Sequence, residues 1–201
     1  MTDVAFWDNI APKYAKDKIS DMEAYVATRT RIQEILQPHH RVLELGCGTG
    51  STALELAVGV DRYIATDFSA GMIAIAQSKT SASHLSFAVQ EDSHLRPGQH
   101  DVILALNLLH LVPNLEQLLA QIYDALPSGG LFIAKTGLLR DGAWFLPMAI
   151  SLMRAVGKAP FARLFSGSEL RGMLRDAGFE ITETLQQDGI APRLFTVARK
   201  P

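Results

Sequence analysis

Three glycines at alternate positions are the first residues whose spacing suggests chemistry. Gly46, Gly48 and Gly50 follow residues 41–45, an apolar run typical of a buried β-strand. Glycine has no Cβ, so the backbone can turn sharply here and a ligand can touch it. A tight turn alone needs fewer glycines, and the pattern therefore predicts a ligand site. It departs from the G-x-G-x-x-G fingerprint of nicotinamide and flavin proteins, because Ser51 stands where that fingerprint has its third glycine.

Polar residues also follow the next predicted strands. Asp67 comes after the second strand, at about the distance expected for an acid that binds a ribose. A carboxylate can accept charge-assisted hydrogen bonds from two neighbouring hydroxyls. The alternative is that Asp67 caps the following helix. With the glycine loop in register, we expect ribose binding, although Asp67 alone does not distinguish one nucleoside cofactor from another.

Two further positions could complete such a site. Residues 91–93, Glu-Asp-Ser, follow the third predicted strand, where an acid could accept from the exocyclic amine of adenine. A solvated loop is the alternative. Asn107 ends an otherwise apolar fourth strand, where a polar side chain indicates either a ligand contact or a helix cap.

Elements that alternate between strand and helix must position these residues. The predicted strands are 41–45, 63–66, 85–89, 101–106, 130–135, 179–184 and 194–197, and helical runs follow the first, second and fourth of them. This alternation predicts an α/β fold, a doubly wound and mostly parallel sheet whose last two strands form an antiparallel pair around Asp188 and Gly189. Ligands bind such sheets beyond the carboxyl ends of the strands, which is where the polar residues fall.

Capping patterns mark several helix ends. Ser20 with Glu23, and Ser166 with Glu169, have the spacing of capping boxes, and Gly178 suits a helix C-terminus. The helix from 49 to 58 follows the glycine turn, and another is predicted from 69 to 78. We predict one domain over 1–201, with an N-terminal helical cap at 1–40 and a helical insertion at 140–165.

Within the insertion, residues 144–156 form an almost wholly apolar helix. Pro147 suits its first turn and Gly157 its end, and only Ser151 and Arg154 are polar between them. A helix that is apolar nearly all round is either buried or covers something apolar. It is therefore either core or a lid over an apolar substrate.

Composition sets the class. The chain has 201 residues, 48% hydrophobic and 20% charged, with a net charge of −2 and one cysteine. These values predict a soluble globular domain, argue against a nucleic-acid binder and exclude a cysteine-rich zinc site. The six histidines show no metal-ligand spacing, so we expect no metal. The first residues do not resemble a signal peptide and no stretch is long enough to span a membrane, so we expect a cytoplasmic protein.

Several segments together resemble a known family. Residues 41–50 and 64–72 look like the first two motifs of class I S-adenosylmethionine-dependent methyltransferases, and residues 101–103, 109–110 and 126–131 resemble their later motifs. The opening, residues 6–15, is similar to the lead-in of the quinone-biosynthesis branch of small-molecule methyltransferases. The resemblance implies a Rossmann-like seven-stranded sheet whose last strand inserts antiparallel.

The resemblance also implies a role for each cofactor residue. Gly46, Cys47 and Gly48 would approach the methionine part, Asp67 the ribose, Phe68 and Met72 the faces of adenine, Asp92 and Ser93 its amine edge, and Asn107 and Tyr14 the methionine end. Relatives often have Gly-Asp-Ala where this chain has Glu91-Asp92-Ser93, so Glu91 is an alternative to Asp92. Cys47 is expected to be a small loop residue rather than a nucleophile.

Methyl transfer from a sulfonium is a direct displacement, which needs a base only if the acceptor must lose a proton. Base candidates are His110 and Tyr25, each with the alternative of a packed core residue, while His94 falls near the expected adenine edge. We predict a methyltransferase that uses S-adenosylmethionine, yields S-adenosylhomocysteine and acts on a small lipophilic or aromatic acceptor, as a monomer or homodimer. The alternatives are a regulatory protein that binds this cofactor without catalysis, and a nicotinamide oxidoreductase, which Ser51 disfavours.

Overall fold

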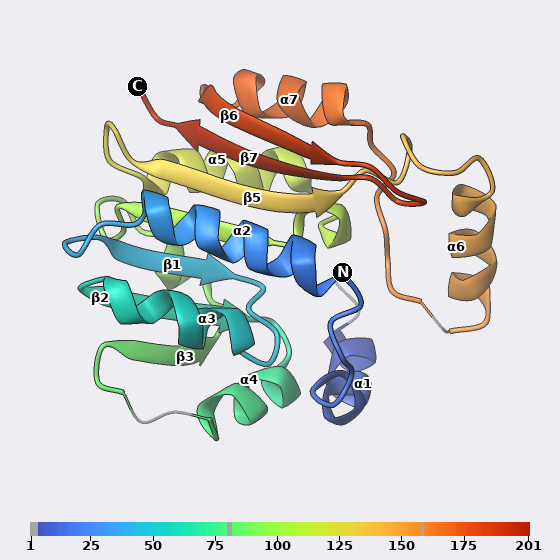
Figure 1. Cartoon of the computed structure of the whole chain (residues 1–201), viewed down its shortest axis with the longest axis horizontal. Coiled ribbons are helices and arrows are strands. Elements are labelled where there is room, and N and C mark those ends of the chain that lie inside the picture. The colour runs from blue at the N-terminus through green and yellow to red at the C-terminus, as the bar shows by residue number, and fades with distance from the viewer. Residues whose placement is uncertain (1–3, 80–81, 158) are drawn as a thin grey trace.

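The computed structural model describes residues 4–79, 82–157 and 159–201, without the side chains of Asp92 and Ser93 (Figure 1). The described residues form one seven-stranded sheet in the order β3-β2-β1-β4-β5-β7-β6. The first five strands are parallel and β7 runs antiparallel to both of its neighbours, as expected. The strands are β1 (Arg41–Leu45), β2 (Arg62–Asp67), β3 (Leu85–Val89), β4 (Val102–Leu106), β5 (Leu131–Gly137), β6 (Glu180–Gln187) and β7 (Arg193–Arg199).

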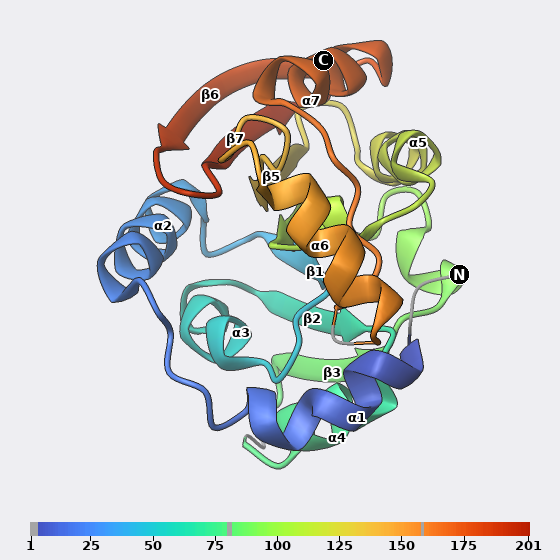
Figure 2. The same cartoon turned by 90° about the vertical axis from the view of Figure 1, so that its right-hand side faces the viewer.

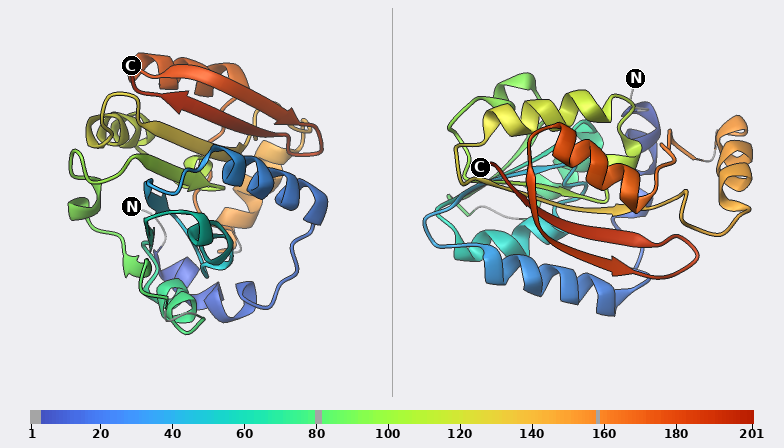
Figure 3. Two further views of the ribbon diagram at one scale, coloured as in Figure 1. Left: turned by 60° about the vertical axis from the view of Figure 1, so that its left-hand side comes forward. Right: turned by 90° about the horizontal axis from the view of Figure 1, so that it is seen from above.

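Helices cover both faces of the sheet, as Figure 3 shows. They are α1 (Val4–Tyr14), α2 (Met22–Ile35), α3 (Ser51–Leu56), α4 (Ala70–Gln77), α5 (Leu115–Ala125), α6 (Leu146–Ala155) and α7 (Gly167–Asp176). One apolar core joins the sheet to α5 and α7, and a second joins it to α2, α3 and α4. Side chains of successive residues in the central strands point alternately into the two cores. Val42 packs in the second core and Leu43 in the first.

Capping groups and glycines explain several of the helix ends. The capping box of Ser166 and Glu169 starts α7, and Gly178, with φ of +98°, follows its last turn. The predicted box at Ser20 is wrong, because the side chain of Asp21 caps α2 by accepting from Ala24 N at 3.0 Å. The helix predicted at 49–58 is shorter, because its N-cap Gly50 is left-handed, and residues 57–59 form a 3₁₀ turn.

Two helices, α1 and α6, lie beyond the carboxyl ends of the strands rather than over a face of the sheet (Figures 1 and 2). Helix α1 packs on α4. Helix α6 contains no buried residue, so the interpretation of residues 144–156 as buried core is wrong. In the part of the chain that the structure describes, no helix is long and apolar enough to cross a membrane.

Candidate functional site

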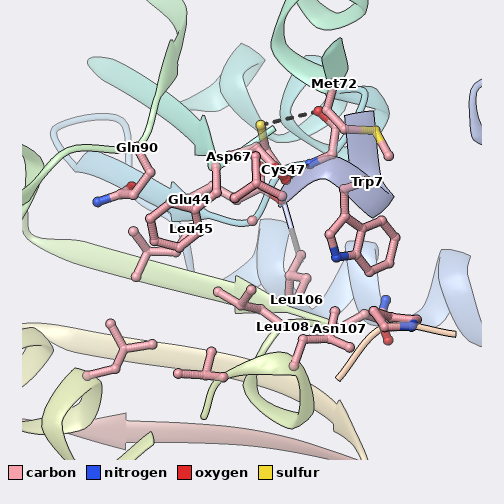
Figure 4. Close-up of a pocket in the computed structure, with 18 of the residues that line it drawn as sticks. Trp7, Glu44, Leu45, Cys47, Asp67, Met72, Gln90, Leu106, Asn107 and Leu108 are labelled. Carbon is pink, nitrogen blue, oxygen red and sulfur yellow. Dashed lines mark hydrogen bonds between the residues drawn. The ribbon is translucent and has the colours of Figure 1, made fainter. Parts of the chain in front are cut away.

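A cavity of about 490 Å³ lies at the carboxyl ends of β1, β2 and β4 (Figure 4). Residues 44–48 of the first motif form its floor, and α1 forms part of its wall. Eight predicted cofactor residues line this cavity: Tyr14, Gly46, Cys47, Gly48, Asp67, Phe68, Met72 and Asn107. The topology therefore brings together residues that lie up to 93 positions apart in the sequence, from Tyr14 to Asn107 (107 − 14).

The glycines of the turn have different tasks. Gly48 has φ of +55°, and a Cβ built there would meet only the Tyr14 ring, with Cε1 3.7 Å away, so its backbone faces the open cavity. A Cβ on Gly50 would lie 2.6 Å from Cε1 of Phe87. Gly48 thus leaves room for a ligand to approach the backbone, whereas Gly50 leaves room for Phe87 in the core.

Asp67 ends β2 with its carboxylate against the glycine turn. Its Oδ2 accepts from Gly48 N at 2.9 Å, and its Oδ1 accepts from Ser69 N at 2.9 Å. Burial raises the pKa of Asp67, while these two hydrogen bonds oppose the rise. Each oxygen keeps a second lone pair, so the carboxylate can still accept from a pair of ribose hydroxyls.

Helix α1 is held over the cavity by one side chain. Oδ1 of Asp8 accepts from Ser69 Oγ at 2.6 Å and from Gly71 N at 2.9 Å, at the start of α4. A Cβ on Gly71 would lie 3.3 Å from the carbonyl oxygen of Asp8, so a glycine suits this close approach. The contact sets Trp7 and Tyr14 of α1 in the cavity wall. We call the group Asp8, Ser69 and Gly71 the α1 latch.

Glu44 is a cavity residue to which the sequence reasoning assigned no role. It lies in β1 with 2% of its surface exposed, and its Oε2 accepts from the Tyr63 hydroxyl at 2.8 Å. Burial raises the pKa of Glu44 to about 7, although the hydrogen bond from Tyr63 acts to lower it. The sequence does contain a sign of its importance, because Glu44 is an acid within a strand whose neighbouring residues are apolar. A buried acid needs a hydrogen-bonding partner or serves a function.

Asn107 stands at the end of β4 in a left-handed conformation. Its φ is +57°, the one positive φ among the described non-glycine residues, and its N–H donates to the Lys135 carbonyl at 2.6 Å. Asparagine tolerates this conformation better than most residues. Backbone conformations of this kind gather at functional sites. Here the conformation puts the Asn107 side chain in the lining of the cavity (Figure 4).

A second cavity, of about 340 Å³, adjoins the first between α1, α6 and residues 159–162. Five residues line both cavities: Trp7, Tyr14, Asn107, Leu111 and Pro160. The remaining lining of the second is largely apolar and consists of His110, Leu139, Ile150, Ala159 and Ala162. Neither cavity is lined by a lysine or arginine in the described residues.

His110 is the titratable imidazole of this second cavity. Its Nδ1 lies 2.9 Å from Thr136 Oγ1, which also accepts from the His110 backbone N–H at 3.2 Å. Burial lowers the pKa of His110 to about 4, and the nearby charge of Arg193 contributes. The ring is therefore neutral near pH 7 and is a weak base.

The other candidates lie elsewhere. Tyr25 does not line either cavity; its hydroxyl is 3.4 Å from that of Thr52, a residue of the first cavity. Nδ1 of His94 accepts from Glu91 N at 3.1 Å, and Glu91 itself lines the first cavity. The side chains of Asp92 and Ser93 lie outside the described part of the structure, so the choice between Glu91 and Asp92 stays a prediction.

Cys47 lines the cavity but carries an unreactive thiol. Burial raises the pKa of Cys47, and the nearby carboxylates of Glu44 and Asp67 raise it further. A thiol that stays protonated is a poor nucleophile. The structure thus agrees with a packing role for this residue.

A mostly parallel sheet with a glycine turn and an acid at the carboxyl ends of neighbouring strands is the arrangement typical of proteins that bind a nucleoside cofactor. The chain matches the family described as methyltransferase domain over residues 14–184. It therefore belongs to this family, the class I S-adenosylmethionine-dependent methyltransferases.

Relatives and solved structures agree with this assignment. A malonyl-[acyl-carrier protein] O-methyltransferase from Geobacter sulfurreducens is 28% identical, with the match covering 85% of this chain and 70% of that protein. A highly reducing polyketide synthase from Phaeosphaeria nodorum is 30% identical over 79% of this chain, which spans only 6% of the synthase. The structure of phosphoethanolamine N-methyltransferase 2 from Haemonchus contortus with S-adenosyl-L-methionine superposes with a TM-score of 0.73, at 17% identity, covering 87% of this chain and 52% of that one.

Proposed function

We propose that the protein transfers a methyl group from S-adenosylmethionine to a small, uncharged, lipophilic acceptor. The observation that carries this proposal is the pair of adjoining cavities. The first is walled by the glycine turn and Asp67, and the second mainly by apolar side chains. Trp7, Tyr14 and Asn107 belong to the boundary that they share, which is where a methyl group would have to pass from donor to acceptor.

The residues of the first cavity fit the cofactor. Gly48 offers backbone with no Cβ in the way, and Asp67 offers free lone pairs for ribose hydroxyls. When bound, the cofactor supplies a methyl group on a positively charged sulfur, which leaves as a neutral thioether when the acceptor takes the methyl. The chain then has to align the acceptor with that methyl and exclude water. Trp7 and Tyr14 of α1 are suited to both tasks.

His110 would serve the acceptor rather than the cofactor. Because its pKa is near 4, it stays neutral and presents a hydrogen-bonding imidazole in an otherwise apolar cavity. We propose that it orients the polar group of the acceptor. A strong general base is required only for an acceptor that must lose a proton in the reaction.

The names of the relatives suggest a second kind of acceptor, an acyl group on a carrier protein. A malonyl group would bring a free carboxylate, and buried carboxylates are normally paired with a cation. The described lining residues of the two cavities include no lysine or arginine. We therefore favour an uncharged acceptor over a malonyl carboxylate.

The test has two stages. In thermal melts, S-adenosylmethionine and S-adenosylhomocysteine should each raise Tm, by roughly 5–10 °C at about 100 times Kd, whereas NAD and NADP should not. Formation of S-adenosylhomocysteine is then followed with lipophilic phenols and quinols and with matched carboxylated compounds. Turnover of only the carboxylated compounds would contradict the proposed acceptor class. Cofactor binding without turnover of any acceptor would favour the non-catalytic regulatory protein.

A further inference from the structure

Helix α6 presents a continuous apolar stripe to solvent. Met148 and Leu152 are neighbours on one side of the helix, and Trp144 and Val156 continue their four-residue spacing just beyond its two ends. Their exposed fractions are 86%, 67%, 67% and 59%. These four residues are called the α6 stripe below.

The α6 stripe does not line the second cavity, which we propose holds the acceptor and call the acceptor cavity below. Ile150 lines that cavity and is partly buried, and helical geometry puts it on the side of α6 away from the stripe. Figure 2 shows α6 lying across the end of the sheet, and no other helix or strand of the described residues covers its outer side. If α6 moved closer to the cavity as a lid, the side that carries Ile150 would face the cavity. The α6 stripe would still be exposed to solvent.

The segment from residue 142 to residue 165 carries charge of one sign. Between residues 142 and 165 the sequence has three basic residues, Arg154, Lys158 and Arg163, and no acidic one. Arg163 forms an ion pair with Glu116. Arg154 lies over the Phe161 ring, with its guanidinium carbon 5.1 Å from the ring centre, and makes no ion pair with another described residue. The segment is thus apolar and cationic.

We propose that α6 is a membrane-interface helix, which lies flat in the headgroup region of a bilayer rich in anionic phospholipid. An exposed apolar side with the cation Arg154 beside it suits contact with anionic lipid, and Trp144, two residues before the helix begins, suits the interface. At ten residues α6 is too short to span a bilayer. A two-fold contact with a second copy is disfavoured, because it would set two cationic segments against each other.

This placement would bring the acceptor cavity to the bilayer surface. Ile150 contributes to the cavity from the inner side of α6, while the α6 stripe faces outward. A lipophilic acceptor could then pass from the bilayer to the site without crossing water. This last consequence rests on the proposed function, whereas binding of α6 to lipid does not and is measured separately.

The test is sedimentation of the full chain with vesicles, in the absence of cofactor. Vesicles of phosphatidylcholine with phosphatidylglycerol are compared with vesicles of phosphatidylcholine alone, at low and high salt. The protein should bind the anionic vesicles, bind the neutral ones less, and lose affinity with salt. The fluorescence of Trp144, isolated in a Trp7→Phe background, should shift to the blue on binding.

A triple variant tests the α6 stripe itself. Met148→Ser, Leu152→Ser and Val156→Ser together should lower the partition coefficient by at least about tenfold, because three apolar contacts with lipid are lost. Val58→Ser, at another exposed position with 80% of its surface accessible, is the matched control and should bind as the unchanged chain does. Arg154→Glu should weaken binding to anionic vesicles alone.

Three results would overturn the proposal: no binding of the unchanged chain to anionic vesicles, equal binding of the triple variant, or binding that ignores lipid charge and salt. A dimer that dissociates in the triple variant without any vesicle binding would assign the stripe to a second copy instead. Capture of an acidic carrier protein without vesicle binding would assign it to that partner. Thermal melts with S-adenosylmethionine are run on the same samples. A rise in Tm without vesicle binding would contradict the membrane proposal alone and leave the proposed cofactor in place.

Discussion

The carboxylate of Asp67 accepts a hydrogen bond from the backbone amide of Gly48, with Oδ2 and N 2.9 Å apart. This bond ties the end of β2 to the glycine turn that follows β1. The acid that we propose binds the ribose is therefore joined directly to the backbone that we propose faces the methionine part.

Asp67→Ala should weaken binding of S-adenosylmethionine by at least about tenfold, since each charge-assisted hydrogen bond contributes roughly 1.5–3 kcal/mol. Isothermal titration calorimetry measures this directly. Asp101→Ala is a matched control, because Asp101 accepts hydrogen bonds from Arg41 at the opposite ends of the strands. It should lower stability without changing cofactor affinity. An unchanged Kd in Asp67→Ala would remove Asp67 from the site.

Gly48→Val should abolish cofactor binding, because the new side chain would occupy the open approach to the backbone. The positive φ adds strain of about 1–2 kcal/mol. Gly98→Val controls for that strain, since Gly98 has φ of +75° and no atom within 4 Å of a built Cβ. The two variants should show similar decreases in Tm. Only Gly48→Val should fail to bind S-adenosylmethionine in the titration. Normal binding by Gly48→Val would move the cofactor elsewhere.

Asp8→Ala should speed cofactor dissociation several-fold, because the α1 latch is lost and Trp7 and Tyr14 are no longer held over the cavity. Asp8→Asn keeps an oxygen that can accept these hydrogen bonds, so its dissociation rate should stay close to that of the unchanged chain. Stopped-flow fluorescence in a Trp144→Phe background, which leaves Trp7 as the sole tryptophan, follows the rate. A lower Tm with an unchanged dissociation rate would limit Asp8 to a structural role.

Glu44 should make the protein less stable as pH rises toward neutrality. Burial raises the pKa of its carboxyl from 4.5 to about 7 in the folded chain, so between these values the native state holds a proton that the unfolded state has lost. The free energy of unfolding therefore falls with pH across this window, by about 1.4 kcal/mol per unit of pKa difference at most. Glu44→Gln should flatten that slope in urea titrations at several pH values. An identical slope in the variant would show that Glu44 ionises as an ordinary surface carboxyl does.

The fold was predictable where a short apolar run ends in polar or turn residues. β1 and β3 have the predicted limits, because Arg41–Leu45 and Leu85–Val89 are such runs. The start of α2 was not predicted, because Ser20 and Asp21 are both good caps and only the backbone decides between them. The antiparallel position of β7 was implied by the family resemblance.

The candidate site was predictable where residues directly follow strands, as Gly48, Asp67 and Asn107 do. The α1 latch was not, since Asp8 and Ser69 are 61 positions apart and no periodicity connects them. The place of Glu44 in the cavity depends on which side of β1 its carboxyl faces and on Tyr63 of the neighbouring strand. Such pairings depend on strand register, which only the assembled sheet defines.

The way α1 is attached has a consequence for how the molecule opens. Its only buried residue is Ala11, and Pro12 cannot donate the backbone hydrogen bond that the Asp8 carbonyl would otherwise accept. We therefore expect detachment of α1, which breaks the α1 latch and the packing on α4, to cost less free energy than opening the sheet, which would expose two cores. Amide hydrogens of α1 should exchange with solvent far sooner than those of β1 and β4, and proteases should cut there first. We therefore expect the native ensemble to contain a state in which this wall of the first cavity is open while the sheet stays intact.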